Sequence, residues 1–140
     1  MKKVVLDASV TMKWLLPAAE QEEDLDAALN ILRCVKASEL QVCQPAHWLA
    51  ETAAVAARLT PETARQDIAD LCEMDFDTID SLEVYLLACE LSVKLNHHLF
   101  DTLYHAAALY LTDAVLITAD RKYYHKAASF KGIALLKDFQ

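Results

Sequence analysis

The chain has 140 residues, of which 55% are hydrophobic and only one is glycine, which suits a single globular domain over residues 1–140 and excludes disordered, collagen-like and turn-rich all-β proteins. Its formal net charge of −8 argues against nucleic-acid binding through basic side chains alone, unless some carboxylates hold divalent cations that carry positive charge to a phosphate. No apolar run approaches the roughly 20 residues of a membrane span, so we expect a cytoplasmic protein.

The first half of the chain predicts two strands and three helices. The segments are a strand over residues 4–6, a helix over 22–36, a strand over 41–44, a helix over 46–59 and a helix over 60–74. The first strand should end in a polar turn at Asp7, and the second should stop at Pro45. We expect Thr60 to cap the third helix, with Pro61 in its first position.

The second half predicts three further strands and three further helices. These are a strand over residues 76–79, helices over 82–95 and 101–111, a strand over 114–117, a helix over 120–128 and a strand over 133–136. Ser81 is a plausible cap for the first of these helices. Because strands alternate with helices, we expect an α/β fold with a mainly parallel sheet between two helical layers.

The four cysteines favour neither a zinc site nor a disulfide framework. They show no C-x-x-C spacing and lie inside apolar stretches, at Cys34, Cys43, Cys72 and Cys89. We therefore expect buried, reduced thiols.

Two aspartates follow predicted strands at places where ligands usually bind. Asp7 comes directly after the first strand, and Asp120 follows the strand over residues 114–117 by a few residues. Ligands of open parallel sheets bind beyond the carboxyl ends of the strands. If the two strands are neighbours, the two carboxylates converge.

Two further carboxylates stand out by their surroundings. Glu51 lies at the edge of an apolar helix face between Trp48 and Val55, and the nearest basic residue, Arg58, is more than one helical turn away. Asp101 begins a predicted helix beside small residues that permit close packing. Four carboxylates in one crevice repel one another unless cations are bound, and all-oxygen ligation favours Mg²⁺ or Mn²⁺ over zinc.

The segments around these four acids resemble the four motifs of PIN domains, in order and at fitting separations. They are Val5-Leu6-Asp7-Ala8-Ser9, Trp48-Leu49-Ala50-Glu51, the run from Phe100 to Ala108 that contains Asp101, and Leu116-Ile117-Thr118-Ala119-Asp120-Arg121. The similarity is greatest to the VapC-type toxins of prokaryotic toxin–antitoxin pairs and covers nearly the whole chain.

The resemblance implies a three-layer α/β/α fold and a Mg²⁺- or Mn²⁺-dependent endoribonuclease whose active site is Asp7, Glu51, Asp101 and Asp120. Ser9 and Thr118 match positions that often carry a hydroxyl near the metal. The resemblance also implies a homodimer and a small antitoxin that covers the active-site groove. The fitting mechanism is in-line attack of water on a phosphodiester, with one cation lowering the pKa of the water and one stabilising the leaving oxygen.

Several of these residues also have structural interpretations. Asp101 and Asp120 could simply cap helices, and Asp7 could hold a turn. Four basic residues are candidates for contacts with RNA phosphates or for a solvated face: Lys13, Arg121, Lys122 and Lys126. The pair His97-His98 is expected in a surface loop, since a two-metal mechanism needs no histidine. The apolar run from Trp14 to Leu16 could be core or a partner surface.

Other functions fit the sequence less well. A haloacid-dehalogenase-like phosphatase needs an aspartate where this chain has Ser9, and a receiver domain needs a pair of acids near the end of the first strand. Gly132 is the only glycine, which excludes a glycine-rich nucleotide-binding loop. A non-catalytic interaction module that keeps the fold stays open as an alternative.

Overall fold

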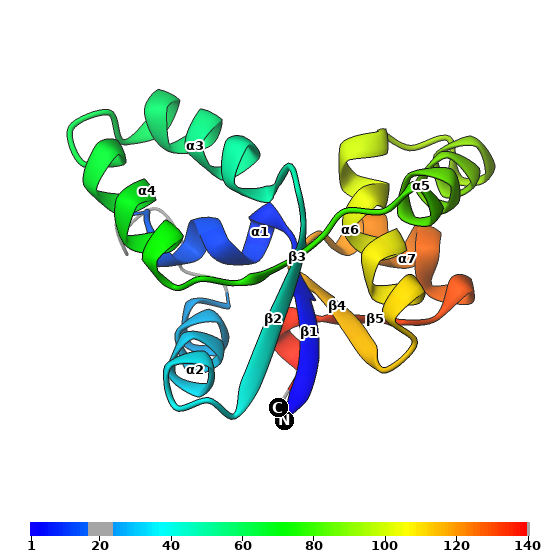
Figure 1. Cartoon of the computed structure of the whole chain (residues 1–140), viewed down its shortest axis with the longest axis horizontal. Coiled ribbons are helices and arrows are strands. Elements are labelled where there is room, and N and C mark those ends of the chain that lie inside the picture. Colours follow the sequence, from blue (N-terminus) through cyan, green and yellow to red (C-terminus); the bar gives the residue numbers. More distant parts are fainter. Residues whose placement is uncertain (17–23, 140) are drawn as a thin grey trace.

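A sheet of five parallel strands lies at the centre of the computed structural model, which describes residues 1–16 and 24–139 (Figure 1). Its strands are β1 (Lys2–Leu6), β2 (Leu40–Pro45), β3 (Asp77–Ile79), β4 (Ala114–Thr118) and β5 (Ile133–Leu135). Their order across the sheet is β3-β2-β1-β4-β5. This confirms the predicted α/β class, and β1 lies beside β4 as the convergence of Asp7 and Asp120 required.

Seven α-helices of the described residues surround the sheet. They are α1 (Ala8–Thr11), α2 (Leu25–Lys36), α3 (Trp48–Leu59), α4 (Ala64–Glu73), α5 (Leu82–Leu95), α6 (Leu99–Leu111) and α7 (Arg121–Ala127). Short 3₁₀ turns follow three of the elements: η1 (Met12–Trp14), η3 (Ala128–Phe130) and η4 (Leu136–Asp138). In Figure 1, β1, β2 and β4 run upward to the middle of the view, where their carboxyl ends lie between α1 and α3 on one side and α6 and α7 on the other.

Alternation along β1 gives the molecule two hydrophobic cores. Val4 and Leu6 point to one face of the sheet, where they pack with Ile31 of α2. Val5 points to the other face, where its cluster contains Leu103 of α6. All three β1 residues are fully buried, as expected for a central parallel strand with helices on both faces. These two cores fix the position of the strand that carries Asp7 at its end.

A buried glutamine side chain extends the pairing of β1 with β2 up to the residue before Asp7. The backbone register ends with Val4 opposite Val42. Beyond it, the amide of Leu6 donates to Gln44 Oε1 at 2.9 Å, and Gln44 Nε2 donates to the carbonyl of Leu6 at 2.8 Å. Gln44 is fully buried, so its side chain satisfies two backbone groups that water cannot reach.

Some local predictions differ from the structure. Thr60 does not cap the following helix: it ends α3, its hydroxyl donates to the carbonyl of Ala56 at 3.2 Å, and α4 begins only at Ala64. The strand predicted to stop at Pro45 includes that residue. The predicted start of the helix over 22–36 lies partly outside the described residues, and the helix is observed from Leu25. Ser81 caps α5 as predicted, accepting from the amide of Val84.

The expectation of buried thiols is wrong for most of the cysteines. All four are free, but only Cys43 is buried, whereas Cys72 and Cys89 are exposed. Each exposed cysteine lies on the outer side of a helix that packs through its other face, so an apolar sequence neighbourhood did not mean burial. No helix of the described residues has the length and hydrophobicity needed to cross a membrane.

Candidate active site

Asp7 is held by a network that joins the ends of β1 and β4. It forms the N-cap of α1, and its Oδ1 accepts from the backbone amide of Ser9 at 3.0 Å and from the Ser9 hydroxyl. The same hydroxyl accepts from the amide of Ala119 at 2.9 Å and lies 3.4 Å from Thr118 Oγ1. Ser9 and Thr118 therefore lie next to Asp7. Asp7 caps α1 and also places a carboxyl group where β1 and β4 end.

The carboxyl group of Asp7 is difficult to ionise in the absence of a cation. Its pKa is raised to about 6, chiefly by burial; hydrogen bonds from Ser9 and Thr118 act against this rise, and the nearby charge of Asp101 adds to it. Desolvation therefore outweighs the repulsion between carboxylates that the sequence suggested as the main cause. A cation beside Asp7 would favour its charged form.

Glu51 reaches the site from α3 and has a tyrosine as its partner. The hydroxyl of Tyr104 on α6 donates to Glu51 Oε1 at 2.9 Å. Tyr104 itself is 1% exposed. The sequence indicated that no basic residue nearby in the chain could pair with Glu51, but a partner 53 residues away was not visible in it.

Asp101 lies inside the first turn of α6 and does not begin the helix. The helix starts at Leu99, and its cap is His98, whose ring nitrogen Nδ1 accepts from the amide of Phe100 at 3.2 Å. Capping therefore does not explain Asp101. Its side chain is 47% exposed, and its Oδ2 lies 2.9 Å from Nε2 of His97.

Asp120, in contrast, is the N-cap of α7. Its Oδ1 accepts from the amide of Tyr123 at 3.0 Å, and its own amide donates to Thr118 Oγ1 at 3.0 Å. The structural interpretation considered from sequence is thus correct for this residue, which leaves its second carboxylate oxygen for other contacts.

Three of the four acids lie near enough to Tyr104 for their charges to affect its hydroxyl. Burial raises the pKa of Tyr104 far above its usual range, followed in effect by the charges of Glu51, Asp7 and Asp101. Asp7 and Asp101 likewise raise the pKa of the neighbouring Tyr123, although less than burial does. The carboxylates of β1, α3 and α6 therefore share one region at the carboxyl ends of the strands, and Asp120 adjoins it through Tyr123.

The donor chemistry of this region fits a hard divalent cation. Carboxylate and hydroxyl oxygens dominate, which suits Mg²⁺ or Mn²⁺, and the desolvated Asp7 beside Asp101 is an arrangement that positive charge would stabilise. Within residues 1–16 and 24–139, no three acidic, histidine or cysteine side chains stand close enough together to hold a metal ion as they are placed. The acids are instead hydrogen bonded to neighbouring protein groups.

The four basic candidates differ in their surroundings. Lys122 is exposed on α7, and Lys13 is half-buried in η1. Arg121 Nη2 lies 3.8 Å from Asp24 Oδ2. Lys126 is directed back to the protein, where its Nζ lies 3.1 Å from both the carbonyl of Asn96 and Nδ1 of His97.

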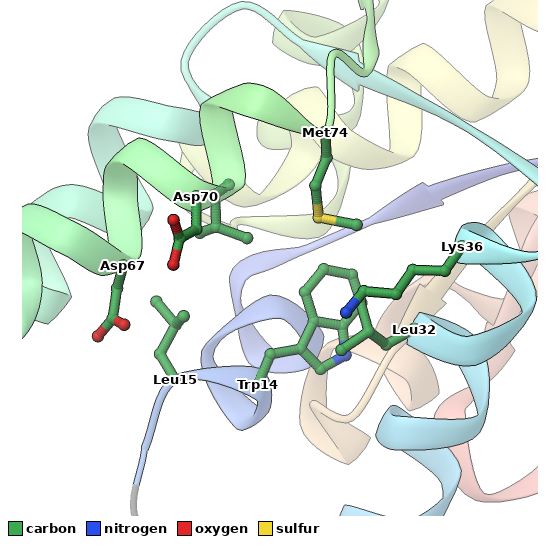
Figure 2. Close-up of a pocket in the computed structure, with 8 residues that line it drawn as sticks. Trp14, Leu15, Leu32, Lys36, Asp67, Asp70 and Met74 are labelled. Atoms are coloured by element: carbon green, nitrogen blue, oxygen red, sulfur yellow. The ribbon is translucent and has the colours of Figure 1, made fainter.

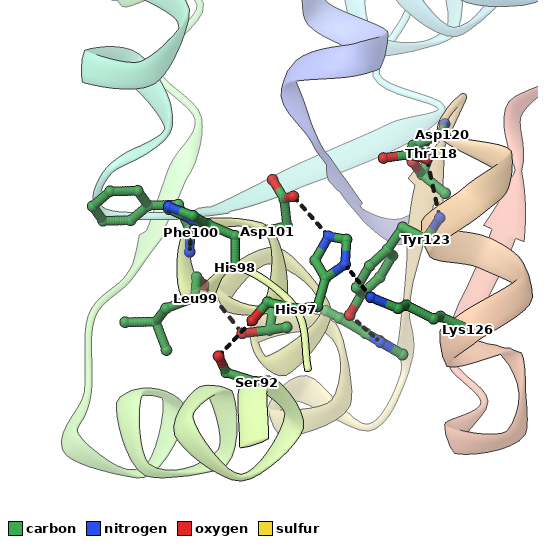
Figure 3. Close-up of polar contacts among 12 residues, drawn as sticks. Ser92, His97, His98, Leu99, Phe100, Asp101, Thr118, Asp120, Tyr123 and Lys126 are labelled. Carbon is green, nitrogen blue, oxygen red and sulfur yellow. Dashed lines mark hydrogen bonds and ion pairs between the residues drawn. The ribbon is translucent and has the colours of Figure 1, made fainter. Parts of the chain in front are cut away.

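Sequence reasoning missed His97 as part of the site. The residue was expected in a surface loop, but its side chain is only 13% exposed and touches Asp101, Lys126 and the ring of Tyr123 (Figure 3). Its position four residues before Asp101 was the one available signal. The error arose because a loop that packs against a helix buries side chains that the polar sequence places outside.

An apolar hollow borders the acidic region next to Glu51. It has a volume of about 320 Å³ and is lined by His47, Ala50, Ala54 and Phe100 besides Glu51. The rings of His47 and Phe100 stack at 5.5 Å, and Phe100 is 50% exposed. The hollow therefore offers an aromatic surface beside a carboxylate.

A second hollow of about 250 Å³ lies farther away, between η1, α2 and α4 (Figure 2). Trp14 and Leu15 line it, with Lys36 on one side and Asp67 and Asp70 on the other. Trp14 also packs against the cores and donates from Nε1 to the carbonyl of Ala28 at 2.9 Å. The apolar run at Trp14 is thus partly core and partly accessible surface.

Comparison with known proteins agrees with this architecture. The sequence matches the PIN domain family over residues 4–129. A search among curated proteins finds no match.

Three solved structures share the fold at low sequence identity. A toxin–antitoxin complex from Klebsiella pneumoniae is 16% identical, with a TM-score of 0.64, and the alignment covers 95% of this chain and 97% of that one. VapBC2 from Rickettsia felis, bound to a DNA fragment from its promoter, is 18% identical, with a TM-score of 0.64, and the alignment covers 95% of this chain and 96% of that one. DNA-bound VapBC from Salmonella typhimurium is 15% identical, with a TM-score of 0.62, and the alignment covers 96% of this chain and 97% of that one. With its parallel sheet, its acids at the carboxyl ends and a match over most of its length, the chain belongs to the PIN-domain family.

Proposed function

We propose that the protein is a Mg²⁺- or Mn²⁺-dependent endoribonuclease that hydrolyses RNA phosphodiester bonds and acts as the toxin of a toxin–antitoxin pair. The observation that carries the proposal is that Tyr104, whose hydroxyl donates to Glu51, lies within reach of the charges of Asp7 and Asp101 at the joined ends of β1 and β4. A buried, desolvated carboxyl group such as that of Asp7, with Asp101 nearby, is unfavourable in its charged form, and a cation would stabilise it. Membership of the PIN-domain family supports nuclease chemistry at this position.

The proposed roles follow from where each side chain is held. Asp7, fixed by Ser9, would be the central ligand of the cation, and Glu51, Asp101 and Asp120 would complete its shell directly or through water. A bound divalent cation supplies two effects, a lower pKa for the attacking water and neutralisation of charge on the phosphate. Ser9 and Thr118 would fix the orientation of Asp7, which they already hydrogen bond.

Contacts with RNA are proposed on both sides of the acids. The basic residues proposed to contact phosphates are Lys13, Arg121, Lys122 and Lys126, three of which lie on α7 directly after Asp120. On the opposite side, the exposed ring of Phe100 beside Glu51 suits the stacking of an unpaired base. The net charge of −8 makes the cation, rather than the protein surface, the main attraction for a phosphate.

The partners are proposed from the proteins of similar structure. The three solved structures are toxin–antitoxin complexes, which supports a small antitoxin protein as the partner of this chain. A homodimer is proposed as well, and the exposed apolar side chains of α5, among them Leu86 and Val93, provide surface that such an assembly could cover. A cytoplasmic location is part of the same proposal.

Cleavage of a structured RNA tests the proposal. Purified protein should cut the RNA with Mg²⁺ or Mn²⁺ but not with chelator, and Asp7→Asn and Asp101→Asn should each lower the rate by at least about a hundredfold. The matched control is Glu90→Gln, which neutralises one exposed carboxylate on α5 away from the site. Unchanged cleavage in chelator or in both variants would overturn the metal-dependent mechanism, whereas no cleavage under any of these conditions would leave the non-catalytic interaction module as the better explanation.

A further inference from the structure

A chain of three polar side chains runs from the acidic region back to α7. Nε2 of His97 lies 2.9 Å from Oδ2 of Asp101, and Nδ1 of the same ring lies 3.1 Å from Nζ of Lys126 (Figure 3). The nuclease chemistry proposed above gives no role to His97. The order of the contacts, with the imidazole between a carboxylate and an ammonium group, calls for one.

The chemistry of the two neighbours determines where the imidazole proton lies. An ammonium group only donates hydrogen bonds, so Nδ1 must accept from Lys126 and carries no proton. An ionised carboxylate only accepts, so Nε2 must carry the proton and donate it to Asp101. Both partners thus require the same neutral tautomer. The hydrogen bonds therefore run in one direction, from Lys126 through His97 to Asp101.

The imidazole is itself held firmly, although it lies between two helices. The ring packs on Tyr123 with centroids 4.7 Å apart. The backbone of His97 is tied to α5 by its amide, which donates to the carbonyl of Ser92 at 3.1 Å, and by its carbonyl, which accepts from the Ser92 hydroxyl at 2.5 Å. Asn96 before it adopts the left-handed conformation, with φ of 48°, that ends α5 and turns the chain toward α6. The donor at Nε2 is therefore fixed in space.

Asp101 needs such a donor more than the other acids do. Its side chain is 47% exposed, and a carboxylate at an exposed helix start can adopt several rotamers. Asp7 is held by Ser9 and Glu51 by Tyr104, whereas Asp101 depends on His97. A ligand that is ordered before the cation arrives loses less conformational entropy on binding.

We propose that His97 and Lys126 are positioning residues that orient the Asp101 carboxylate for a divalent cation. His97 fixes Oδ2 through its Nε2–H donor, and Lys126 fixes the tautomer and the ring by donating to Nδ1. The inference rests on the proposed function, because it assigns Asp101 to a cation site. It adds an outer layer to that site from residues that neither the family resemblance nor the four acids include, and it gives Lys126 a role besides the contact with RNA.

Calorimetric titration of the full chain with Mn²⁺ tests the positioning role without using RNA. His97→Ala removes the donor and should weaken Mn²⁺ binding about tenfold or more, the usual effect of losing an outer-shell partner. His97→Gln keeps an amide N–H donor near the Nε2 position and should restore most of the affinity. Lys126→Met should cause a smaller loss, since the ring keeps its donor but loses its anchor.

Two control variants change the same residue types elsewhere. His125→Ala removes an exposed histidine of α7, and Lys94→Met removes an exposed lysine of α5, so both should bind Mn²⁺ like the wild type. Circular dichroism shows whether each variant is folded. Long-range ¹H–¹⁵N spectra of the metal-free protein provide a second readout, in which Nε2 of His97 should be protonated and Nδ1 unprotonated.

The outcomes separate the two proposals. If the wild type binds Mn²⁺ and His97→Ala binds it equally well, or if His97→Gln is as weak as His97→Ala, the positioning role is overturned while the nuclease proposal stands. The opposite tautomer of His97 also overturns it. If the wild type itself binds no Mn²⁺, the proposed function fails and the positioning role fails with it.

Discussion

Replacement of Asp7 by asparagine should stabilise the metal-free protein. The asparagine side chain would keep the oxygen that accepts from the amide and hydroxyl of Ser9, so the hydrogen bonds that hold the residue survive the change. What the variant removes is the charge. Since burial raises the pKa of Asp7 from 3.8 to about 6, the ionised form is less favourable in the folded protein than in the unfolded chain.

The size and the pH dependence of the effect follow from that pKa. The rise in the pKa of Asp7 from 3.8 to about 6 corresponds to about 3 kcal/mol in the free energy of unfolding. The wild type has this stability while Asp7 is protonated and loses it when Asp7 ionises. The contribution is fully present below about pH 3.8, is lost as the pH rises through about 6, and is absent at pH 7 and above. The advantage of Asp7→Asn should therefore grow from near zero at about pH 4 to about 3 kcal/mol at about pH 8.

Urea unfolding of both proteins in chelator between about pH 4.5 and 8 measures this difference. The two proteins have to be compared at each pH because other groups also change the stability with pH. Burial lowers the pKa of His105, so the stability that neutral His105 contributes is lost as the pH falls, opposite to the effect of Asp7. Glu90→Gln serves as the control and should show no such trend. Added Mn²⁺ at a hundred times its dissociation constant should stabilise the wild type by about 2.7 kcal/mol and cancel most of the difference, and at a thousand times, about 4.1 kcal/mol, it should reverse the order. A pH-independent difference, or equal free energies of unfolding of the wild type with and without Mn²⁺, would refute the reasoning.

Three further predictions concern the scaffold and the surface. Gln44→Met should lower the free energy of unfolding by about 2–6 kcal/mol in urea, because two buried backbone groups of Leu6 lose their partners. Gln41→Met, near the start of the same strand, removes only a solvent-exposed hydrogen bond to Asp77 and should cost below about 1 kcal/mol; equal losses would contradict the argument. Tyr104→Phe should weaken Mn²⁺ binding about tenfold in calorimetry, and unchanged binding would remove Tyr104 from the site. The isolated protein should bind bulk RNA weakly and with a shallow salt dependence in filter binding, whereas tight and steeply salt-dependent binding would show that its surface is more basic than its charge indicates.

The sequence was most informative where local pattern and topology agree. Central strands such as β1 and β4 are short β-branched runs, and parallel pairing of neighbours places their carboxyl ends together. This was enough to predict that Asp7 and Asp120 lie at the same edge of the sheet. The convergence of Asp7 with Asp101 could be expected only from the family resemblance, because nothing near Asp101 in sequence indicates which edge its helix faces.

The sequence was least informative where a long-range partner decides the chemistry. Glu51 was recognised as a carboxylate without a nearby cation, but its hydrogen bond comes from Tyr104 on another helix. Asp101 was expected at the start of its helix, yet His98 provides the cap, which moves Asp101 into the first turn and toward His97. The prediction for Thr60 was wrong for a local reason, since its hydroxyl donates to the carbonyl of Ala56, four residues earlier, instead of capping α4. Such choices depend on which of two local hydrogen bonds the tertiary packing favours.

The position of β1 also determines when the acidic region can form during translation. β1 precedes the other four described strands in the sequence, but it lies in the middle of the sheet, between β2 and β4. Ser9, which holds Asp7, bonds to Ala119 across 110 residues of sequence. At the usual synthesis rates, on the order of 10 s separate the emergence of these two residues. A nascent chain therefore carries Asp7 well before it carries the segment around Ala119, to which Ser9 ties that acid in the folded protein.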